Sequence, residues 1–194
     1  MKRTIPTTAL LLAVALFTAG CGAKKPAPDP LRSECTVDGQ AAPRWVCGLH
    51  HDEARYTAVG TARKSRLGFG FMREEALAEA RANLAQQAAL DVKARTTRFA
   101  RSTGAGESET VERVVETVTK QVTRVTLRDS RQAAYWENPA NGDIYLLVEA
   151  DRSKVYEAAK KALQNRFDND GALRQQTAAR EALEALDKAF PESP

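Results

Sequence analysis

The sequence predicts an α+β fold, in which a small three-stranded antiparallel sheet is packed by a long helix and the chain ends in a helical tail. Three segments carry this prediction. Residues 55–62 alternate like a half-buried strand, residues 73–101 keep one apolar face at helical spacing, and residues 138–143 gather turn formers between two strand-like runs. The predicted order of elements is strand, long helix, shorter helix, hairpin and helix.

The first 20 residues have the features of a bacterial signal peptide. Lys2 and Arg3 give a positive start, and the apolar run from Ala9 to Phe17 is shorter than the roughly 20 residues of a membrane span. The run ends in Leu16–Cys21, which resembles a bacterial lipobox, with small residues before the cysteine. This resemblance implies cleavage before Cys21 and diacylglycerol on its thiol. An ordinary secretory signal or a short membrane anchor is the alternative.

The residues after Cys21 bear on location and partners. Gly22 follows the cysteine, and by analogy only an aspartate there would favour the inner membrane, so we expect an outer-membrane anchor with the domain facing the periplasm. Residues 21–33 contain three prolines and should form an extended tether. Without Lys2 and Arg3, the 29 basic and 25 acidic residues become 27 and 25, which indicates no nucleic-acid partner.

Two cysteines remain once Cys21 is assigned to lipid. In an oxidising compartment the pair Cys35 and Cys47 predicts a disulfide. Free thiols are one alternative, and a metal site with His50 and His51 is a weaker one, because the cysteines lack the close spacing of structural zinc sites. The same segment, residues 34–51, contains Trp45 and Val46, which we expect to cover one end of the core.

The predicted first strand and long helix should pack closely. Gly60 interrupts strand 55–62, and a glycine inside a strand usually marks either a bulge or the close approach of another backbone, here that of the following helix. Gly68–Phe71 is expected to be a loop that leads into that helix. An apolar stripe should then face the sheet. Its members, spaced three or four apart, are Leu77, Ala80, Leu84, Ala88 and Val92.

Three arginines lie toward the end of the long helix. Arg95, Arg98 and Arg101 could hold a phosphate or an acidic glycan, and so could the series Arg124, Arg128 and Arg131. A helix terminus with cations matched to the helix dipole explains the first three equally well, and we prefer that interpretation.

The remaining elements are read from turn formers and periodicity. A second helix should begin near Ser108 and give way, near Val122, to a strand that carries Val125 and Leu127 and ends near Trp136. The turn at 138–143 should join this strand to residues 144–149 in an antiparallel hairpin. Helices at 152–167, capped by Asp151, and at 172–189 should follow. The last of these either packs back on the domain or meets a partner.

Several short motifs are similar to the LPP20 family of bacterial lipoproteins. They are Pro43-Arg44-Trp45-Val46, then Tyr56–Ala62, then the alanine-rich helix with Ala76, Ala80 and Asn83-Leu84-Ala85. The resemblance covers about residues 43–157. The family includes flagellar-associated outer-membrane proteins of the FlgP kind and resembles the first domain of the flagellar protein FlgT. The resemblance implies a helix on a three-stranded antiparallel sheet, no catalytic centre, and ring assembly in some members. We place the domain at residues 34–167 and a C-terminal helix at 168–194.

The sequence offers little for catalysis. His50 and His51 are the only histidines, and neither a Gly-x-Ser-x-Gly elbow nor a His-Glu-x-x-His helix is present. A dyad of either histidine with Ser65 or Cys47 is the enzymatic alternative. We expect no enzyme and no cofactor. The expected function is a non-catalytic envelope scaffold that binds itself or another envelope protein. The alternative is a binding module for anionic glycans or lipid head groups.

Overall fold

The computed structural model describes residues 35–102, 109–169 and 179–191. The predicted signal peptide, Cys21, the tether, the cap at Ser108 and the start of the last helix lie outside these residues. The elements in chain order are β1 (Thr36–Val37), β2 (Gln40–Ala41), η1 (Arg44–Cys47), β3 (Arg55–Ala62), α1 (Phe69–Ser102), α2 (Glu109–Asp129), β4 (Arg131–Glu137), β5 (Ile144–Asp151), α3 (Arg152–Asn169) and α5 (Ala179–Ala189).

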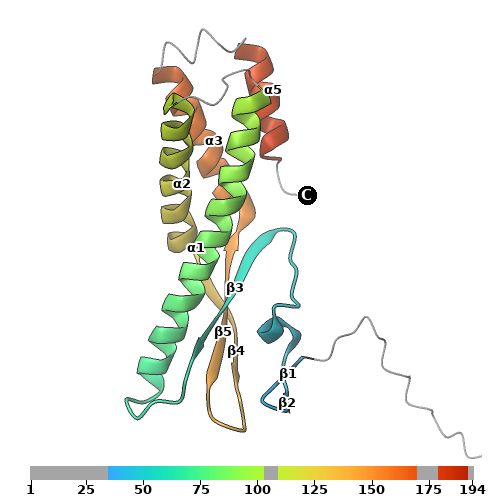
Figure 1. Ribbon diagram of the computed structural model, residues 1–194, viewed down its shortest axis with the longest axis vertical. Coiled ribbons are helices and arrows are strands. Elements are labelled where there is room, and N and C mark those ends of the chain that lie inside the picture. Colours follow the sequence, from blue (N-terminus) through green and yellow to red (C-terminus); the bar gives the residue numbers. More distant parts are fainter. Residues whose placement is uncertain (1–34, 103–108, 170–178, 192–194) are drawn as a thin grey trace, which may run out of the picture. The chain divides into compact units, whose positions relative to one another are not determined.

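The main sheet has three antiparallel strands in the order β3-β5-β4, which confirms the predicted α+β class (Figure 1). The register of β3 on β5 runs from Arg55 opposite Asp151 to Ala62 opposite Ile144. The predicted hairpin is confirmed, because β4 and β5 pair across the turn at 138–143, with a bulge between Gln132 and Ala134. Both β3 and β4 are therefore edge strands.

Helix α1 lies along one face of this sheet (Figure 1). It packs so closely on β3 that the backbones of the two elements approach each other directly. A Cβ atom added to Gly60 would lie 2.0 Å from the carbonyl oxygen of Ala76 and 2.4 Å from the amide nitrogen of Ala80. The predicted close approach at Gly60 is confirmed. The predicted apolar stripe from Leu77 to Val92 is also buried.

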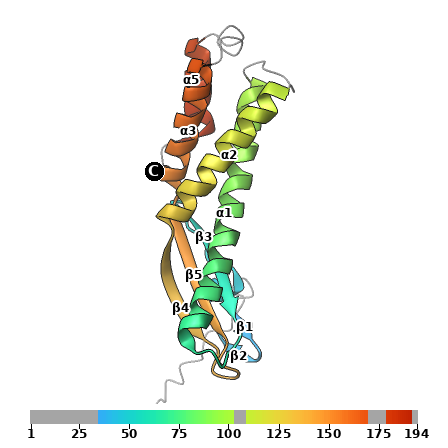
Figure 2. The ribbon, with the colours of Figure 1, turned by 90° about the vertical axis from the view of Figure 1, so that its left-hand side faces the viewer.

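Beyond the end of the sheet, α1 continues and packs with the other helices (Figure 2). Val118 and Val122 of α2 and Val155 and Leu163 of α3 join the same apolar cluster as the sheet. Helix α5 adds the buried side chain of Leu186, and Phe190 just beyond it packs edge to face on Tyr156, with ring centroids 5.5 Å apart. The last helix therefore packs back on the domain.

Two predicted boundaries are wrong. Val125 and Leu127 were expected in a strand, but α2 continues to Asp129 and the strand begins only at Arg131. The segment Gly68–Phe71 was expected to be a loop, but α1 begins at Phe69, directly after Gly68, whose φ of +90° turns the chain into the helix.

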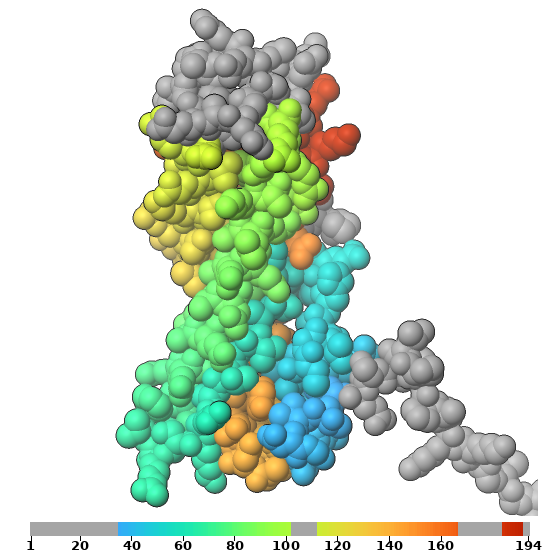
Figure 3. Space-filling model, in the orientation of Figure 1, coloured from blue at the N-terminus to red at the C-terminus, as the bar shows by residue number. Residues whose placement is uncertain are grey.

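The N-terminal segment lies against the β4–β5 turn (Figure 3). Asp38 accepts hydrogen bonds from the Nδ2 atoms of Asn138 and Asn141, each at 3.0 Å. A disulfide joins Cys35 to Cys47, with 5.8 Å between their Cα atoms. Trp45 and Val46 are only half-buried and do not belong to the core cluster, so the prediction that they cover its end is wrong.

Candidate functional site

A cleft of about 610 Å³ follows the open edge of β3. We call it the β3 cleft. Strand residues 55–59 line it along this edge. One wall is a stripe of α1 with a spacing of four residues, and the other wall comes from residues 45–52. The stripe consists of Asn83, Gln87, Asp91 and Arg95. The cleft thus lies between α1 and the segment of residues 45–52.

Asp91 is the centre of the polar network at one end of this cleft. Its Oδ2 accepts hydrogen bonds from the hydroxyl groups of Tyr56 at 2.5 Å and Tyr156 at 2.8 Å, and its Oδ1 accepts one from Arg95 Nε at 2.9 Å. Burial alone would raise the pKa of Asp91, but the two hydroxyl donors and the Arg95 charge outweigh it and lower the pKa. One carboxylate therefore links β3, α1 and α3.

Arg95 extends this network to the end of α5. Its guanidinium lies 4.7 Å from the ring centroid of Tyr156, and its Nη1 donates a hydrogen bond to the carbonyl oxygen of Ala189 at 2.9 Å. A cation at the last carbonyls of α5 is favourable for the helix dipole. Internal contacts thus account for Arg95, whereas Arg98 is exposed and donates a hydrogen bond to Ala94 O of its own helix. Arg101 is also exposed.

Arg152 lies in the same cleft and has no carboxylate partner among the described residues. Its guanidinium stacks on Tyr56, 4.6 Å from the ring centroid. Its Nε is buried and makes no hydrogen bond within the described chain. Its backbone N–H donates a hydrogen bond to the carbonyl oxygen of Ala54 at 3.0 Å.

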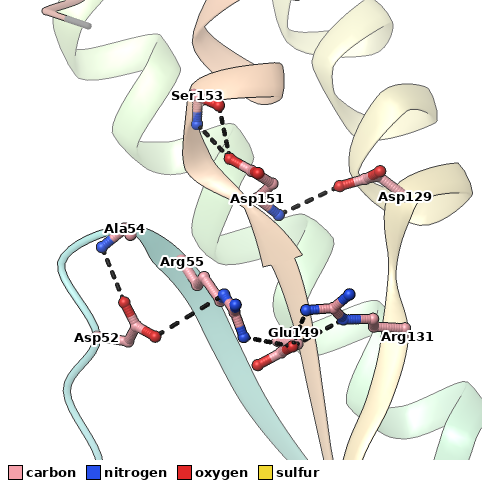
Figure 4. Close-up of polar contacts among 8 residues, drawn as sticks. All are labelled: Asp52, Ala54, Arg55, Asp129, Arg131, Glu149, Asp151 and Ser153. Atoms are coloured by element: carbon pink, nitrogen blue, oxygen red, sulfur yellow. Dashed lines mark hydrogen bonds and ion pairs between the residues drawn. The ribbon is translucent and has the colours of Figure 1, made fainter. Parts of the chain in front are cut away.

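A second polar cluster surrounds Glu149 on the opposite face of the sheet from the core (Figure 4). Its Oε1 accepts from Arg55 Nη1 at 2.6 Å and from Arg131 Nε at 2.8 Å, so one oxygen of β5 binds cations from both neighbouring strands. The Glu149 side chain is only 10% exposed. Burial would raise its pKa, but Arg55 and Arg131 outweigh that effect and lower it.

The capping predicted for Asp151 is confirmed in the same region (Figure 4). Its Oδ1 accepts hydrogen bonds from the backbone N–H of Ser153 at 2.9 Å and from the hydroxyl of Ser153 at 2.7 Å. These bonds satisfy the first turn of α3 and lower the pKa of Asp151.

The lowered pKa values predict a loss of stability in acid. The ordinary pKa values of glutamate and aspartate are 4.5 and 3.8, and in the folded chain the pKa values of Glu149 and Asp91 are lower than these. Their stabilising contribution is therefore present above those values and disappears as the pH falls through the folded pKa. In urea unfolding between pH 7 and pH 3, the free-energy difference between the wild type and Glu149→Gln should be largest above about pH 5 and shrink in acid.

Glu112→Gln on the exposed side of α2 is the matched control and should follow the wild type at every pH. A difference between Glu149→Gln and the wild type that stays constant down to pH 3 would contradict the ion-pair account.

The histidines and cysteines of the alternatives are also placed. His50 and His51 are exposed on the wall of the cleft, and the sulfur atoms of Cys35 and Cys47 are joined to each other, so neither cysteine can act as a thiolate ligand or nucleophile there. The Ser65 hydroxyl accepts from the N–H of Leu67 at 3.2 Å. Within the described ranges, no group of three or more potential ligands could hold a metal ion.

Sequence reasoning missed the polar side chains of this site. Tyr56, Asp91 and Tyr156 come from three distant segments, and nothing local in the sequence marks them as partners. The one available signal was the position of each residue within its helix or strand. Asp91 precedes the buried Val92, and Tyr56 falls on the buried face of its strand.

Comparison with known families and proteins gives one result. A family model described as LPP20 lipoprotein matches residues 43–151, which include the whole sheet and every residue that lines the cleft except Arg152. Curated proteins give no match. In the parts of the chain that the structure describes, none of the helices combines the length and apolar character needed to cross a bilayer.

Proposed function

Because the chain belongs to the LPP20 lipoprotein family and so is a lipoprotein of the cell envelope, we propose that it is a non-catalytic assembly module. It is held at the outer membrane by lipid on Cys21 and faces the periplasm. The lipobox-like segment Leu16–Cys21 supports the anchor. Each buried methylene of a lipid chain contributes about 0.8 kcal/mol, so two or three chains give a durable attachment.

The observation that carries the assembly role is an exposed apolar surface beside the open edge of β4. We call this surface the β4 patch. It consists of Leu67, Phe69, Phe71 and Tyr135, which are 72%, 53%, 46% and 42% exposed. Phe69 and Tyr135 already contact each other edge to face, with centroids 5.7 Å apart. Leu67 and Phe71 lie two residues before and after Phe69 in the chain, and exposed apolar side chains beside an open strand are typical of an interaction site.

The partner that fits the β4 patch is a second copy of this chain. When two copies of β4 pair antiparallel about a two-fold axis, the unpaired backbone N–H and C=O groups of both edge strands form hydrogen bonds. The same arrangement brings the two apolar surfaces together. The ends of β4 carry opposite charges, Arg131 and Glu137, so antiparallel pairing places unlike ends together. Anchoring in one membrane would also raise the effective concentration of the copies.

The test is the mass of the detergent-solubilised full-length chain by density-matched sedimentation equilibrium. We expect the wild type to exceed the monomer mass increasingly with concentration, and Phe71→Glu to shift it toward the monomer, because a charge in the patch opposes its burial. Leu90→Glu is the matched control, since Leu90 is 61% exposed and lies on α1 about 30 Å along the helix from Phe71.

Leu90→Glu should associate like the wild type. A wild type that stays monomeric at all concentrations, or a Phe71→Glu variant that associates unchanged, would refute the role of the β4 patch. The narrower proposal of a flagellar role is tested separately. A deletion strain should lose motility and regain it with the wild-type gene, and unimpaired motility would exclude that role.

A further inference from the structure

We propose that the β3 cleft binds a short extended peptide whose carboxylate pairs with Arg152. The ligand class is a peptide carboxylate, from a chain end or an acidic side chain. This inference goes beyond the assembly role and uses a different surface from the β4 patch, so either can fail without the other.

The first argument is the charge balance of the cleft. Both carboxylates that line it are engaged, Asp91 by two tyrosines and Arg95, and Asp52 by the N–H of Ala54 and by Arg55. Arg152 is the lining cation without an anion among the described residues. Withdrawing a guanidinium from water without a hydrogen-bond acceptor is unfavourable, and a carboxylate is the acceptor that matches its planar donors.

The stacking of Arg152 supports a binding role for its free donors. The Tyr56 ring holds the guanidinium by its face, and the Tyr56 hydroxyl is itself fixed by Asp91. The Tyr56 ring therefore fixes the plane of the guanidinium, and the N–H donors at the edge of that plane remain for a ligand. Such orientation lowers the entropic cost of forming the ion pair.

The second argument is the hydrogen bonding of the β3 edge. Some backbone groups of β3 point away from β5, and two of these are bound by side chains of α1. Asn83 Nδ2 donates to Val59 O at 3.2 Å, and Glu79 Oε2 accepts from Thr61 N at 2.6 Å. Because outward groups recur every second residue, the N–H and C=O of Thr57 and the N–H of Val59 point the same way. These three groups have no partner within the described chain, and they adjoin the cleft.

An extended peptide satisfies both observations together. Its backbone would pair with Thr57 and Val59 as an added strand, and its carboxylate would reach the Arg152 end of the cleft. The cleft volume of about 610 Å³ lies within the usual range for small-ligand sites. Trp45 and Val46 on the outer wall supply apolar surface for its side chains.

The experiment observes the full-length chain in detergent micelles by NMR while acetylated tripeptide pools are added. One pool ends in a free carboxylate and a matched pool ends in an amide. We expect the acid pool to shift the Arg152 Nε–H and the Thr57 and Val59 amide signals, and the amide pool to bind at least about tenfold more weakly. An N-methylated acid pool, which cannot pair as a strand, should also bind more weakly.

Arg152→Gln should lose the preference for the acid pool, whereas the exposed Arg98→Gln should keep it. The changes to the peptide leave the protein untouched, so the test does not depend on the folding of any variant. Equal binding of acid and amide pools, binding of acetate as tight as that of the peptides, or no shift at millimolar concentrations would each overturn the proposal. A pool of acidic side-chain peptides with amide ends separates the two carboxylate sources.

Discussion

Gly60→Ala is expected to destabilise the fold by about 3 kcal/mol or more, because the added methyl group would overlap backbone atoms of α1. The new Cβ would lie 2.0 Å from Ala76 O and 2.4 Å from Ala80 N. Both are backbone atoms inside α1, so the clash is relieved only if the helix moves off the sheet. Overpacking of a core typically costs about 1–3 kcal/mol, and here no side chain can rotate away.

Urea unfolding of the full-length chain measures this effect. Gly70→Ala is the matched control, because Gly70 lies in α1 and a Cβ there meets nothing within 4 Å. That substitution should stabilise the chain by about 0.4–1 kcal/mol through helix propensity and the unfolded state. The same unfolding midpoint for the two variants would contradict the close backbone packing of β3 on α1 at Gly60.

Asp91→Ala should reduce the free energy of unfolding by about 3 kcal/mol and weaken the packing of α5. It leaves the hydroxyl groups of Tyr56 and Tyr156 without their acceptor and Arg95 without its counter-ion. Since Arg95 also holds the Ala189 carbonyl, amide hydrogen exchange should accelerate in α5 more than in the sheet.

Asp187→Ala is the control for this prediction. Asp187 is 76% exposed and pairs with Lys160 at 2.8 Å, and a surface pair of this kind contributes at most about 1 kcal/mol. An Asp91→Ala variant as stable as Asp187→Ala would show that the network contributes nothing beyond a surface ion pair.

Elements with strong periodicity or dense turn formers were predictable. Strand 55–62 matches β3 at both ends, because alternation, β-branched residues and a flanking charge agree there. The turn at 138–143 forms as predicted. Its backbone is closed by hydrogen bonds from Asn138 N to Asp143 O and from Gly142 N to Asn138 O.

The second half of α2 was not predictable from propensity. Its valines and threonines favour strands, but Val118, Val122 and Thr126 lie one turn apart and are fully buried. The threonine hydroxyls are satisfied inside the helix, for example Thr126 to Val122 O at 2.9 Å. Burial against the neighbouring helices outweighs local preference, and the spacing of four residues was the signal that pointed to it.

The candidate site was the least predictable part. Arg95, Arg98 and Arg101 stand out in the sequence as one cationic series, but Arg95 turns inward to Asp91 and Ala189. Arg152 is the first residue of α3, and nothing in the neighbouring sequence indicates a binding role for it. Its position over the Tyr56 ring depends on the pairing of β3 with β5. Such contacts arise from tertiary packing and leave no local pattern.

Attachment to the membrane through Cys21 is the premise of the proposed function, and intact-mass analysis of the chain purified from its native membrane tests it most directly. The account predicts a mature chain that begins at Cys21 and carries the added mass of diacylglycerol. A free thiol at Cys21, or an amino terminus at any other residue, would contradict it.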